Sequence, residues 1–483
     1  MGNAACCKQY CPGCPCSCCL CPEENDALIY CNPMSVSLYD YTARTVEDLS
    51  IQKGERLEII KEEGDWIYVR KQTEECKEEE GYVPRSFIRL VGSIEAEPWY
   101  FEHITKRMDA KRCLLRVENG DGAFLVWKNK EQGHYYLSVR NGDAARHYKI
   151  LEAVDLFYLV ERKKFISVSQ LVKYYTQHAD GLCAELDKPC VMLDLPSIPT
   201  LSHFTADQWE VERSTLKKVK WLDRGEFGNV WEGIWNNTTD VAIKELSVSS
   251  QFKEQILNEI VIMKELNHER LLKLYAVCTQ EEPFYIVTEL MRNGSLSKFL
   301  KDHNEKKDLE FSLMIDFAVQ IAEGMAYLER QKIIHMDLRA DNILLTGMLS
   351  CKISDFGLAQ FTNTQTQMEG VKVPIKWMAP EVFNRNEFTI KCDVWSFGVL
   401  LTEIITYGQE PYPGMGKTDC VKFLLSGMRM SPPEGCPDSL YDIMLLCWKQ
   451  NSLERPAFIE LHGKLLKLIQ ASLVEETIGG PEE

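Results

Sequence analysis

The sequence has no long apolar run and no excess of positive charge. No stretch of about 18 consecutive apolar residues occurs, whereas a helix that crosses a bilayer needs about 20. The N-terminal segment also lacks the apolar core of a secretory signal. The net charge is -17 and no basic patch stands apart from it, so a nucleic-acid backbone would repel the chain. We therefore expect an intracellular protein with no membrane-spanning helix and no nucleic-acid partner.

Cysteine is sparse over most of the chain, although the total is 19. Ten cysteines are scattered singly beyond residue 31, a pattern typical of reduced core thiols in a cytosolic protein. The length of 483 residues predicts roughly three domains at about 150 residues each. We expect the protein to act as a monomer.

The first 34 residues are rich in cysteine, glycine and proline and have no periodic apolar face. Such a segment cannot bury a core, so we expect a tail. Gly2, exposed once Met1 is removed, fits N-myristoylation, although Cys6 stands where that motif usually has serine or threonine. One myristoyl chain binds a membrane only marginally, and acylation of Cys6 and Cys7 would supply a second anchor.

Two other readings of the tail remain open. Cys11, Cys14 and the run from Cys18 to Cys21 have a spacing that thiolate metal sites use. The tail would then hold a metal instead of lipid. The third reading is an unmodified tail.

The central motif is His335 to Asn342, HMDLRADN, followed by Asp355-Phe356-Gly357. An aspartate able to accept a hydroxyl proton, with an asparagine and a second aspartate able to hold Mg²⁺, is what phosphoryl transfer from ATP requires. This set is the protein-kinase signature.

Upstream residues complete that pattern. Gly225-x-x-Gly228 joins two predicted strands, and its backbone N–H groups can cover phosphates. Lys244 ends the strand run VAIK, and Glu259 lies on the helix predicted to follow. An ion pair between Lys244 and Glu259 would aim the ammonium group at the phosphates of ATP.

With these motifs in order, residues 35–470 resemble a Src-type non-receptor tyrosine kinase, nearest to the Frk, Brk and Srms branch. The resemblance implies a multidomain fold: a small β-barrel (SH3-like) at 35–91, an α+β domain (SH2-like) at 97–190 and a bilobal α+β protein kinase fold at 214–472. A linker at 191–213 and a tail at 473–483 complete the chain. The substrates would be tyrosines of proteins.

The resemblance also implies roles for single residues of the kinase domain. Asp337 would be the catalytic base, supported by Arg339, and Mg²⁺ would bind Asn342 and Asp355. The ATP site would be formed by Leu222, Gly225, Gly228, Val230, Ala242, Lys244, Thr288, Glu289 and Met291.

The SH3-like domain would bind proline-rich ligands, because a polyproline helix is already extended and loses little entropy in an aromatic groove. The groove residues implied are Tyr39, Tyr41, Asp48, Trp66, Pro84 and Phe87. We expect these aromatic side chains to form a groove, because one small barrel cannot bury so many. The linker segment Pro196 to Pro199 is a candidate ligand within the same chain, since tethering raises its effective concentration.

The SH2-like domain departs from its family at the phosphate-binding arginine, which is Trp127 here. Indole has one neutral N–H donor and no charge. Lys106, His147 and Lys149 occupy the auxiliary positions of the pocket. We expect Trp127 to fill the pocket as part of the core.

Further departures affect other residues that take part in phosphotyrosine control in the family. No tyrosine occurs from Phe356 to Glu381 or after Tyr441, and Met336 and Gln360 replace two cations of the family pattern. Both phosphate acceptors and their cations are absent together, which indicates an enzyme without phosphotyrosine control. The alternative is a catalytically weak scaffold that acts through its SH3 domain, favoured by the unusual residues Asp223, Met336 and Asp341 near the site.

Dual acylation would place the protein on the cytoplasmic face of membranes, with some of it cytosolic. Gly2→Ala removes the N-terminal glycine that myristoylation requires. This variant is therefore expected to move to the cytosolic fraction on centrifugation. Ala27→Gly, outside the motif, is the matched control and is expected to stay with the membranes. Retention of the Gly2 variant on membranes, or zinc without lipid on the native tail, would contradict acylation.

Overall fold

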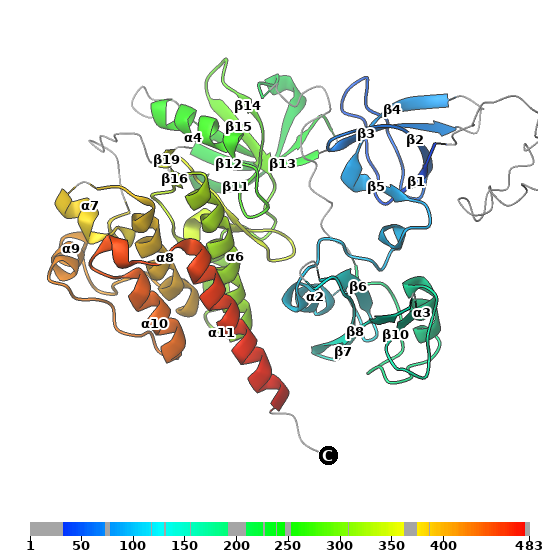
Figure 1. Cartoon of the computed structure of the whole chain (residues 1–483). Coiled ribbons are helices and arrows are strands. Elements are labelled where there is room, and N and C mark those ends of the chain that lie inside the picture. Colours follow the sequence, from blue (N-terminus) through cyan, green and yellow to red (C-terminus); the bar gives the residue numbers. More distant parts are fainter. Residues whose placement is uncertain are drawn as a thin grey trace, which may run out of the picture.

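The computed structural model describes the chain from residue 32 to residue 478 with interruptions, and we discuss only these residues. The described ranges are 32–72, 78–116, 118–129, 132–154, 156–191, 209–225, 228–237, 239–246, 253–307, 309–361, 374–385 and 387–478. The predicted acylation sites and the Pro196 to Pro199 segment lie outside them. Three folded parts follow one another along the chain (Figure 1).

The SH3-like domain is a five-stranded antiparallel sheet in the order β4-β3-β2-β1-β5. Burial alternates along β2, because side chains of a strand point in turn to opposite faces. Tight turns between strands use Gly54 and Gly64, both at positive φ. The elements are β1 Met34–Ser37, β2 Arg56–Glu63, β3 Trp66–Gln72, β4 Glu78–Pro84, η1 Arg85–Phe87 and β5 Ile88–Leu90.

The SH2-like domain is built on β6, whose two faces are both covered. Phe124 and Val126 belong to a core with α3, whereas Leu125 and Trp127 belong to a second core with α2. Before α2 the described residues of this domain form an isolated bridge, Tyr100 to Val126, but no strand. The elements are η2 Ile94–Ala96, α2 Arg107–Leu114, β6 Phe124–Lys128, β7 Tyr135–Asn141, β8 Ala144–Lys149, β9 Leu151–Ala153, β10 Leu156–Tyr158 and α3 Val168–Tyr175.

The kinase-like domain begins with an antiparallel sheet in the order β11-β12-β13-β15-β14, with α4 beside it (Figure 1). Gly228 is required where β12 starts, because a Cβ there would lie 1.7 Å from the carbonyl oxygen of Glu245. The elements of this lobe are η3 Arg213–Thr215, β11 Leu216–Gly225, β12 Gly228–Trp235, β13 Thr239–Leu246, α4 Lys253–Glu265, β14 Leu274–Cys278 and β15 Phe284–Glu289.

The second lobe is helical and is centred on α6 and α8. An apolar stripe of α6 is buried and consists of Met314, Phe317, Ile321, Met325 and Leu328. Its elements are α5 Leu296–Asp302, α6 Phe311–Arg330, β16 Ile333–Ile334, η4 Ala340–Asn342, β17 Ile343–Leu345, β18 Cys351–Ile353, β19 Gln360–Phe361, η5 Ile375–Trp377, α7 Pro380–Arg385, α8 Ile390–Ile405, α9 Lys417–Leu425, α10 Asp438–Cys447, η6 Ser452–Glu454 and α11 Phe458–Ile478.

Among the described helices, α6 is long and apolar enough to cross a membrane, but 78% of the relevant window is buried within the protein. That burial, together with its contacts to α8 and α11, is typical of the core helix of a folded lobe. The barrel, the α+β domain and the bilobal domain confirm the predicted fold classes.

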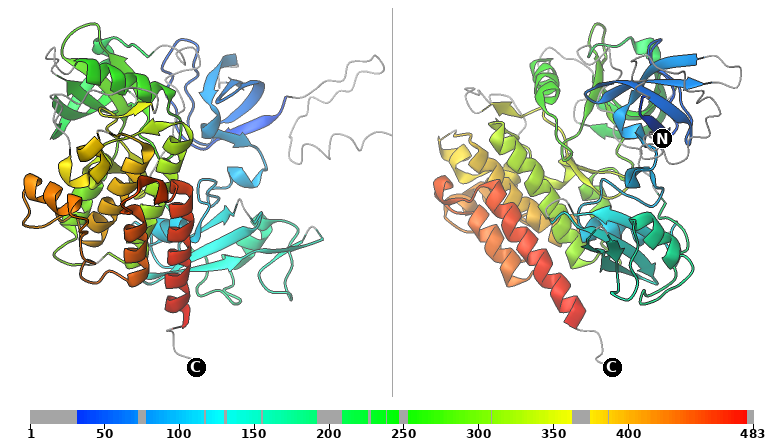
Figure 2. Two further views of the ribbon diagram at one scale, coloured as in Figure 1. Left: turned by 60° about the vertical axis from the view of Figure 1, so that its left-hand side comes forward. Right: turned by 45° about the vertical axis from the view of Figure 1, so that its right-hand side comes forward.

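The two small domains lie along one side of the bilobal domain. The SH3-like domain is beside the first lobe and the SH2-like domain is beside α6 and α11 (Figure 2). The Arg44 guanidinium lies 5.5 Å from the ring of Trp235 in the first lobe, a cation–π contact. Arg89 and Glu102 form an ion pair between the SH3-like and SH2-like domains.

Two helical glycines give a matched test of packing in the second lobe. A Cβ on Gly398 of α8 would lie 2.5 Å from Nε1 of Trp448 and 2.8 Å from Cβ of Cys447. Gly398→Ala is therefore expected to destabilise the lobe by about 1–3 kcal/mol through overpacking. A Cβ on Gly463 of α11 meets no atom within 4 Å, so Gly463→Ala is expected to stabilise by about 0.5–1 kcal/mol. Urea unfolding followed by tryptophan fluorescence measures both, and equal shifts would contradict this account.

Candidate active site

The catalytic loop is fixed by a buried carboxylate of α8. The backbone N–H groups of His335 and Met336 donate to the two oxygens of Asp393, at 2.7 and 2.9 Å. Burial raises the pKa of Asp393 to about 7, against the opposing effect of these two donors. Met336 has φ 67°, a conformation that non-glycine residues keep only where their surroundings hold it. The methionine that replaces the family arginine thus has a buried side chain and an anchored backbone.

Asp337 and Asn342 are joined within this loop. Nδ2 of Asn342 donates to the backbone oxygen of Asp337 at 2.8 Å, so Oδ1 of Asn342 is the atom that can face a cation. The hydroxyl of Ser354 donates to the carbonyl of Asn342 at 2.9 Å. This bond ties the loop to the residue immediately before Asp355.

Arg339 lies between two carboxylates and an aromatic ring. Its guanidinium is 3.5 Å from Asp337 and 3.3 Å from Asp341, and it lies 5.3 Å from the ring centre of Trp377. Nε1 of Trp377 donates to Glu403 at 2.9 Å. Burial raises the pKa of Glu403 to about 7. Through Glu403 and Trp377, helix α8 therefore also supports the part of the loop that carries Arg339.

Lys244, Glu259 and Asp355 come together as predicted for an ATP site. Nζ of Lys244 lies 2.8 and 3.0 Å from the two oxygens of Glu259 and 3.6 Å from Oδ1 of Asp355. Burial alone would lower the pKa of Lys244, but the two carboxylates outweigh it and raise that pKa. The Lys244 ammonium is the main cause of the lowered pKa of Asp355. A charged lysine beside an ionised aspartate suits phosphate and Mg²⁺.

Strand register places the predicted nucleotide-binding residues on neighbouring strands. Val230 of β12 is opposite Lys244 of β13, and Ala242 of β13 is opposite Thr288 of β15. Gly225 pairs with Gly228 around the glycine turn. The other predicted residues are Leu222 on β11, Glu289 at the end of β15 and Met291 just after it.

Glu289 has a structural use in addition to its predicted place in the ATP site. Its Oε1 accepts from the backbone N–H of Lys273 at 2.8 Å and lies 2.7 Å from Nζ of Lys352. Lys273 precedes β14 of the first lobe, whereas Lys352 is in β18 of the second. The side chain therefore links the lobes at the connecting segment.

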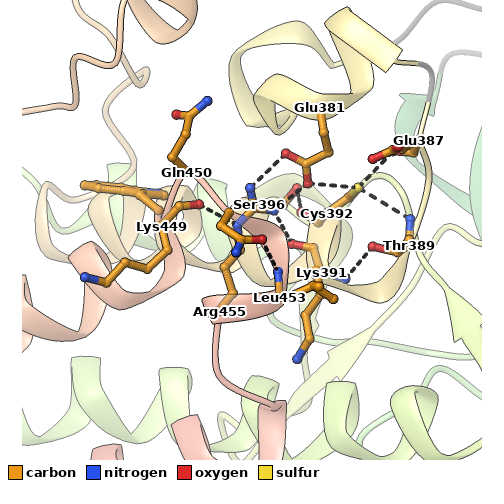
Figure 3. A network of polar contacts seen from close by, with 12 residues as sticks. Glu381, Glu387, Thr389, Lys391, Cys392, Ser396, Lys449, Gln450, Leu453 and Arg455 are labelled. Carbon is orange, nitrogen blue, oxygen red and sulfur yellow. Dashed lines mark hydrogen bonds and ion pairs between the residues drawn. The ribbon is translucent and has the colours of Figure 1, made fainter.

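The segment after the catalytic residues is braced by Arg455. Its two terminal nitrogens lie 2.5 and 2.8 Å from the two oxygens of Glu381 (Figure 3). The guanidinium also donates to the carbonyls of Lys449 and Lys391. The Arg455 side chain is fully buried, so this bidentate pair fixes α7 against α8.

The aromatic residues of the SH3-like domain correct one expectation. Tyr41, Trp66 and Phe87 are at most 4% exposed, so the argument that so small a barrel could not bury them was wrong. They pack edge to face, with Tyr41 5.8 Å from Phe87 and 6.2 Å from Trp66. The Tyr41 hydroxyl donates to Asp48 at 2.8 Å, which lets the ring be buried without an unmet donor. Pro84 is buried too, and Tyr39 is half-buried.

The altered SH2 pocket is filled by indole. Trp127 is 1% exposed and stacks on Tyr136, with ring centres 4.8 Å apart. Its Nε1 donates to Ser138 at 2.9 Å, and the Ser138 hydroxyl is 2.8 Å from Nδ1 of His147. Burial lowers the pKa of His147 to about 4, so this imidazole is neutral at physiological pH. Lys106 occupies the N-cap position of α2 without a side-chain hydrogen bond to the helix, and Lys149 is exposed.

Sequence reasoning missed the two carboxylates of α8 that hold the loop. Asp393 and Glu403 are acids in an otherwise apolar, buried helix, and such placement signals a polar partner. Their partners, the backbone N–H groups of residues 335, 336 and 340, have no sequence signature.

Comparisons with known proteins agree with this geometry. Residues 36–85 match the SH3 domain family, residues 99–175 match the SH2 domain family, and residues 216–465 match the family of protein tyrosine and serine/threonine kinases. Human tyrosine-protein kinase FRK is 42% identical over 454 residues, covering 90% of each chain.

These families imply general ligands. SH3 domains imply proline-rich ligands, SH2 domains imply phosphotyrosine ligands, and the kinase family implies protein substrates, ATP and a divalent metal, generally Mg²⁺. With SH3, SH2 and kinase domains in this order, the chain belongs to the Src-type non-receptor protein-tyrosine kinases, near FRK.

Proposed function

We propose that Asp337, Lys244, Asn342 and Asp355 each have a separate role in phosphoryl transfer to tyrosine in this kinase. The Asp337 carboxylate takes the proton from the tyrosine hydroxyl as that oxygen attacks the γ-phosphate. Lys244, held by Glu259, orients the phosphates. Asn342 and Asp355 would hold Mg²⁺, which neutralises developing charge.

One observation carries this proposal: the Lys244 ammonium lies within 3.6 Å of both Glu259 and Asp355. The three groups come from β13, from α4 and from the segment after β18, so residues of both lobes meet at one place, which supports the proposal. The departures that favour a weak scaffold do not interrupt this set. Met336 contributes its backbone to the Asp393 bond, and Asp341 contacts Arg339.

The division of roles is tested by Asp337→Asn. This variant keeps the shape of the side chain but cannot accept the proton, so phosphorylation of a tyrosine polymer by the full-length protein is expected to fall by about a hundredfold or more. Asp302→Asn on the exposed end of α5 makes the same chemical change away from the site and is expected to leave the rate unchanged. Wild-type turnover by the Asp337 variant would contradict the assignment, and a wild type as slow as that variant would favour the scaffold.

We also propose that phosphotyrosine-based autoregulation is lost. In the place where an arginine would grip phosphate, the Trp127 indole is stacked on Tyr136 and bonded to Ser138. A neutral His147 adds no charge there. A tail phosphotyrosine would require a tyrosine near the C-terminal end of the sequence, and none follows Tyr441.

Two parts of this proposal concern the surroundings of the enzyme. Acylation at Gly2, Cys6 and Cys7 would hold it at the cytoplasmic face of membranes, with a cytosolic fraction. Proline-rich segments, including Pro196 to Pro199 of its own linker, would bind the SH3 domain at its Tyr39 edge. The sequence pattern supports both.

The SH2 proposal is tested with Trp127→Arg in the full-length protein. Loss of the cation of a buried charge pair costs about two to four orders of magnitude in affinity, so the variant is expected to gain that much for a tyrosine phosphopeptide in calorimetry. Ser138 and His147 already face this position. Trp221→Arg adds the same charge at an exposed tryptophan of β11 and is expected to bind no better than wild type. Micromolar phosphate-dependent binding by the wild type would refute the loss.

A further inference from the structure

The SH2 domain touches the second kinase lobe through helix α2. Nζ of Lys111 lies 2.8 Å from Glu310, just before α6, and the Arg112 guanidinium forms an ion pair with Asp316 within α6. The views in Figure 2 show the SH2 domain beside this part of the kinase. The contact is charged, and it pairs cations of one domain with carboxylates of the other.

The Arg112–Asp316 pair is more buried than the Arg89–Glu102 and Lys111–Glu310 pairs between domains. The Arg112 side chain is 9% exposed and that of Asp316 is 4% exposed. Asp109, one turn earlier on α2, forms a second ion pair with the same guanidinium. A buried charge without its partner is strongly unfavourable, so removal of either Arg112 or Asp316 would disfavour the docked arrangement.

Asp316 is linked in turn to the strand that precedes Asp355. Nε2 of Gln320 donates to Asp316 at 2.7 Å, and Oε1 of Gln320 accepts from the backbone N–H of Cys351 at 2.8 Å. Oε1 also accepts from Arg270 at 2.9 Å. A continuous set of polar contacts therefore runs from the SH2 domain to β18, at the base of the active site.

The Arg112–Asp316 ion pair does not involve Trp127, Ser138 or His147 of the altered phosphotyrosine pocket. Trp127 bonds to Ser138 of its own domain. A cavity of about 1470 Å³ lies among the three domains and is lined by Tyr39 and Arg89 of the SH3 domain, Lys106 and Trp127 of the SH2 domain, and Glu323 and His462 of the kinase. The filled pocket borders this cavity, as do Asp109 and Asp316 of the charged contact.

We propose that the Asp109–Arg112–Asp316 cluster is a phosphate-independent docking joint that holds the SH2 domain on the kinase lobe. The inference rests on the proposed loss of phosphotyrosine control, because it supplies the anchor that a tail phosphotyrosine would otherwise provide. The Asp316 carboxylate of the kinase replaces the phosphate as the anion, and Arg112 of α2 replaces the pocket arginine as the cation. The Lys244–Glu259 pair is formed while the joint is closed, so docking is compatible with an assembled active site.

The joint is tested by charge reversal in the full-length protein. All variants carry Asp337→Asn, which blocks autophosphorylation, and are treated with phosphatase. Arg112→Asp is expected to lower the ratio of docked to undocked molecules by about a hundredfold or more. The readouts are the radius of gyration by small-angle X-ray scattering and amide exchange in residues 107–114.

Two controls separate the joint from general effects of charge. Arg162→Asp removes an exposed arginine that is paired with Asp180 inside the SH2 domain and is expected to leave the protein docked. Lys111→Glu acts at the rim, where Glu310 is 52% exposed, and is expected to weaken docking only by a few-fold.

Rescue distinguishes undocking from misfolding. Arg112→Asp with Asp316→Arg is expected to restore the compact form. If that double variant does not fold, Lys111→Glu with Glu310→Lys is expected to reverse the few-fold weakening caused by Lys111→Glu, measured as amide exchange in residues 107–114. A compact Arg112→Asp variant, or a wild type that opens on phosphatase treatment alone, would overturn the joint. Neither readout involves a phosphopeptide, so phosphopeptide binding by the wild type would refute the proposed loss of control separately.

Discussion

Carboxylates buried beneath the catalytic loop are the constraint on which this active site depends. Asp393 accepts hydrogen bonds from the backbone N–H groups of His335 and Met336. Glu403 accepts hydrogen bonds from the backbone N–H of Ala340 and from the indole N–H of Trp377. Both acids project from α8, which is buried along most of its length. The loop that carries Asp337 is therefore positioned by the core of the second lobe, and the core tolerates the acids because each is hydrogen-bonded.

The same chemistry recurs at the edges of the kinase. Arg455 and Glu381 brace α7, Lys244 and Glu259 join β13 to α4 within the first lobe, and Arg112 and Asp316 join the SH2 domain to α6. Each pair is at least partly buried, and the value of such pairs lies in positioning more than in net stability. The domain arrangement of this chain is thus specified by a few directional charge pairs, while apolar burial supplies the folding free energy within each domain.

Local motifs made much of this structure predictable. The spacing of Asp337, Asn342 and Asp355 identified the catalytic loop, and the apolar stripe of α6 identified its buried face. Partners distant in sequence were not predictable, because Arg112 and Asp316 are 204 positions apart and share no motif. The aromatic residues of the SH3 domain were misjudged for a different reason. Their identity shows that they cluster, but only the fold shows that Tyr41, Trp66 and Phe87 shield one another from solvent.

The bond between Glu289 and Lys352 has a consequence for molecules that compete with ATP. One carboxylate at the connecting segment holds a backbone N–H group of the first lobe and a lysine of the second, and both charged side chains are nearly buried. A bulky inhibitor that pushes this segment outward must lengthen the distance between Glu289 and Lys352, where little water can replace the lost contact. Slim, flat heterocycles would avoid the strain, so selectivity among such compounds would depend on their thickness as much as on their hydrogen bonds.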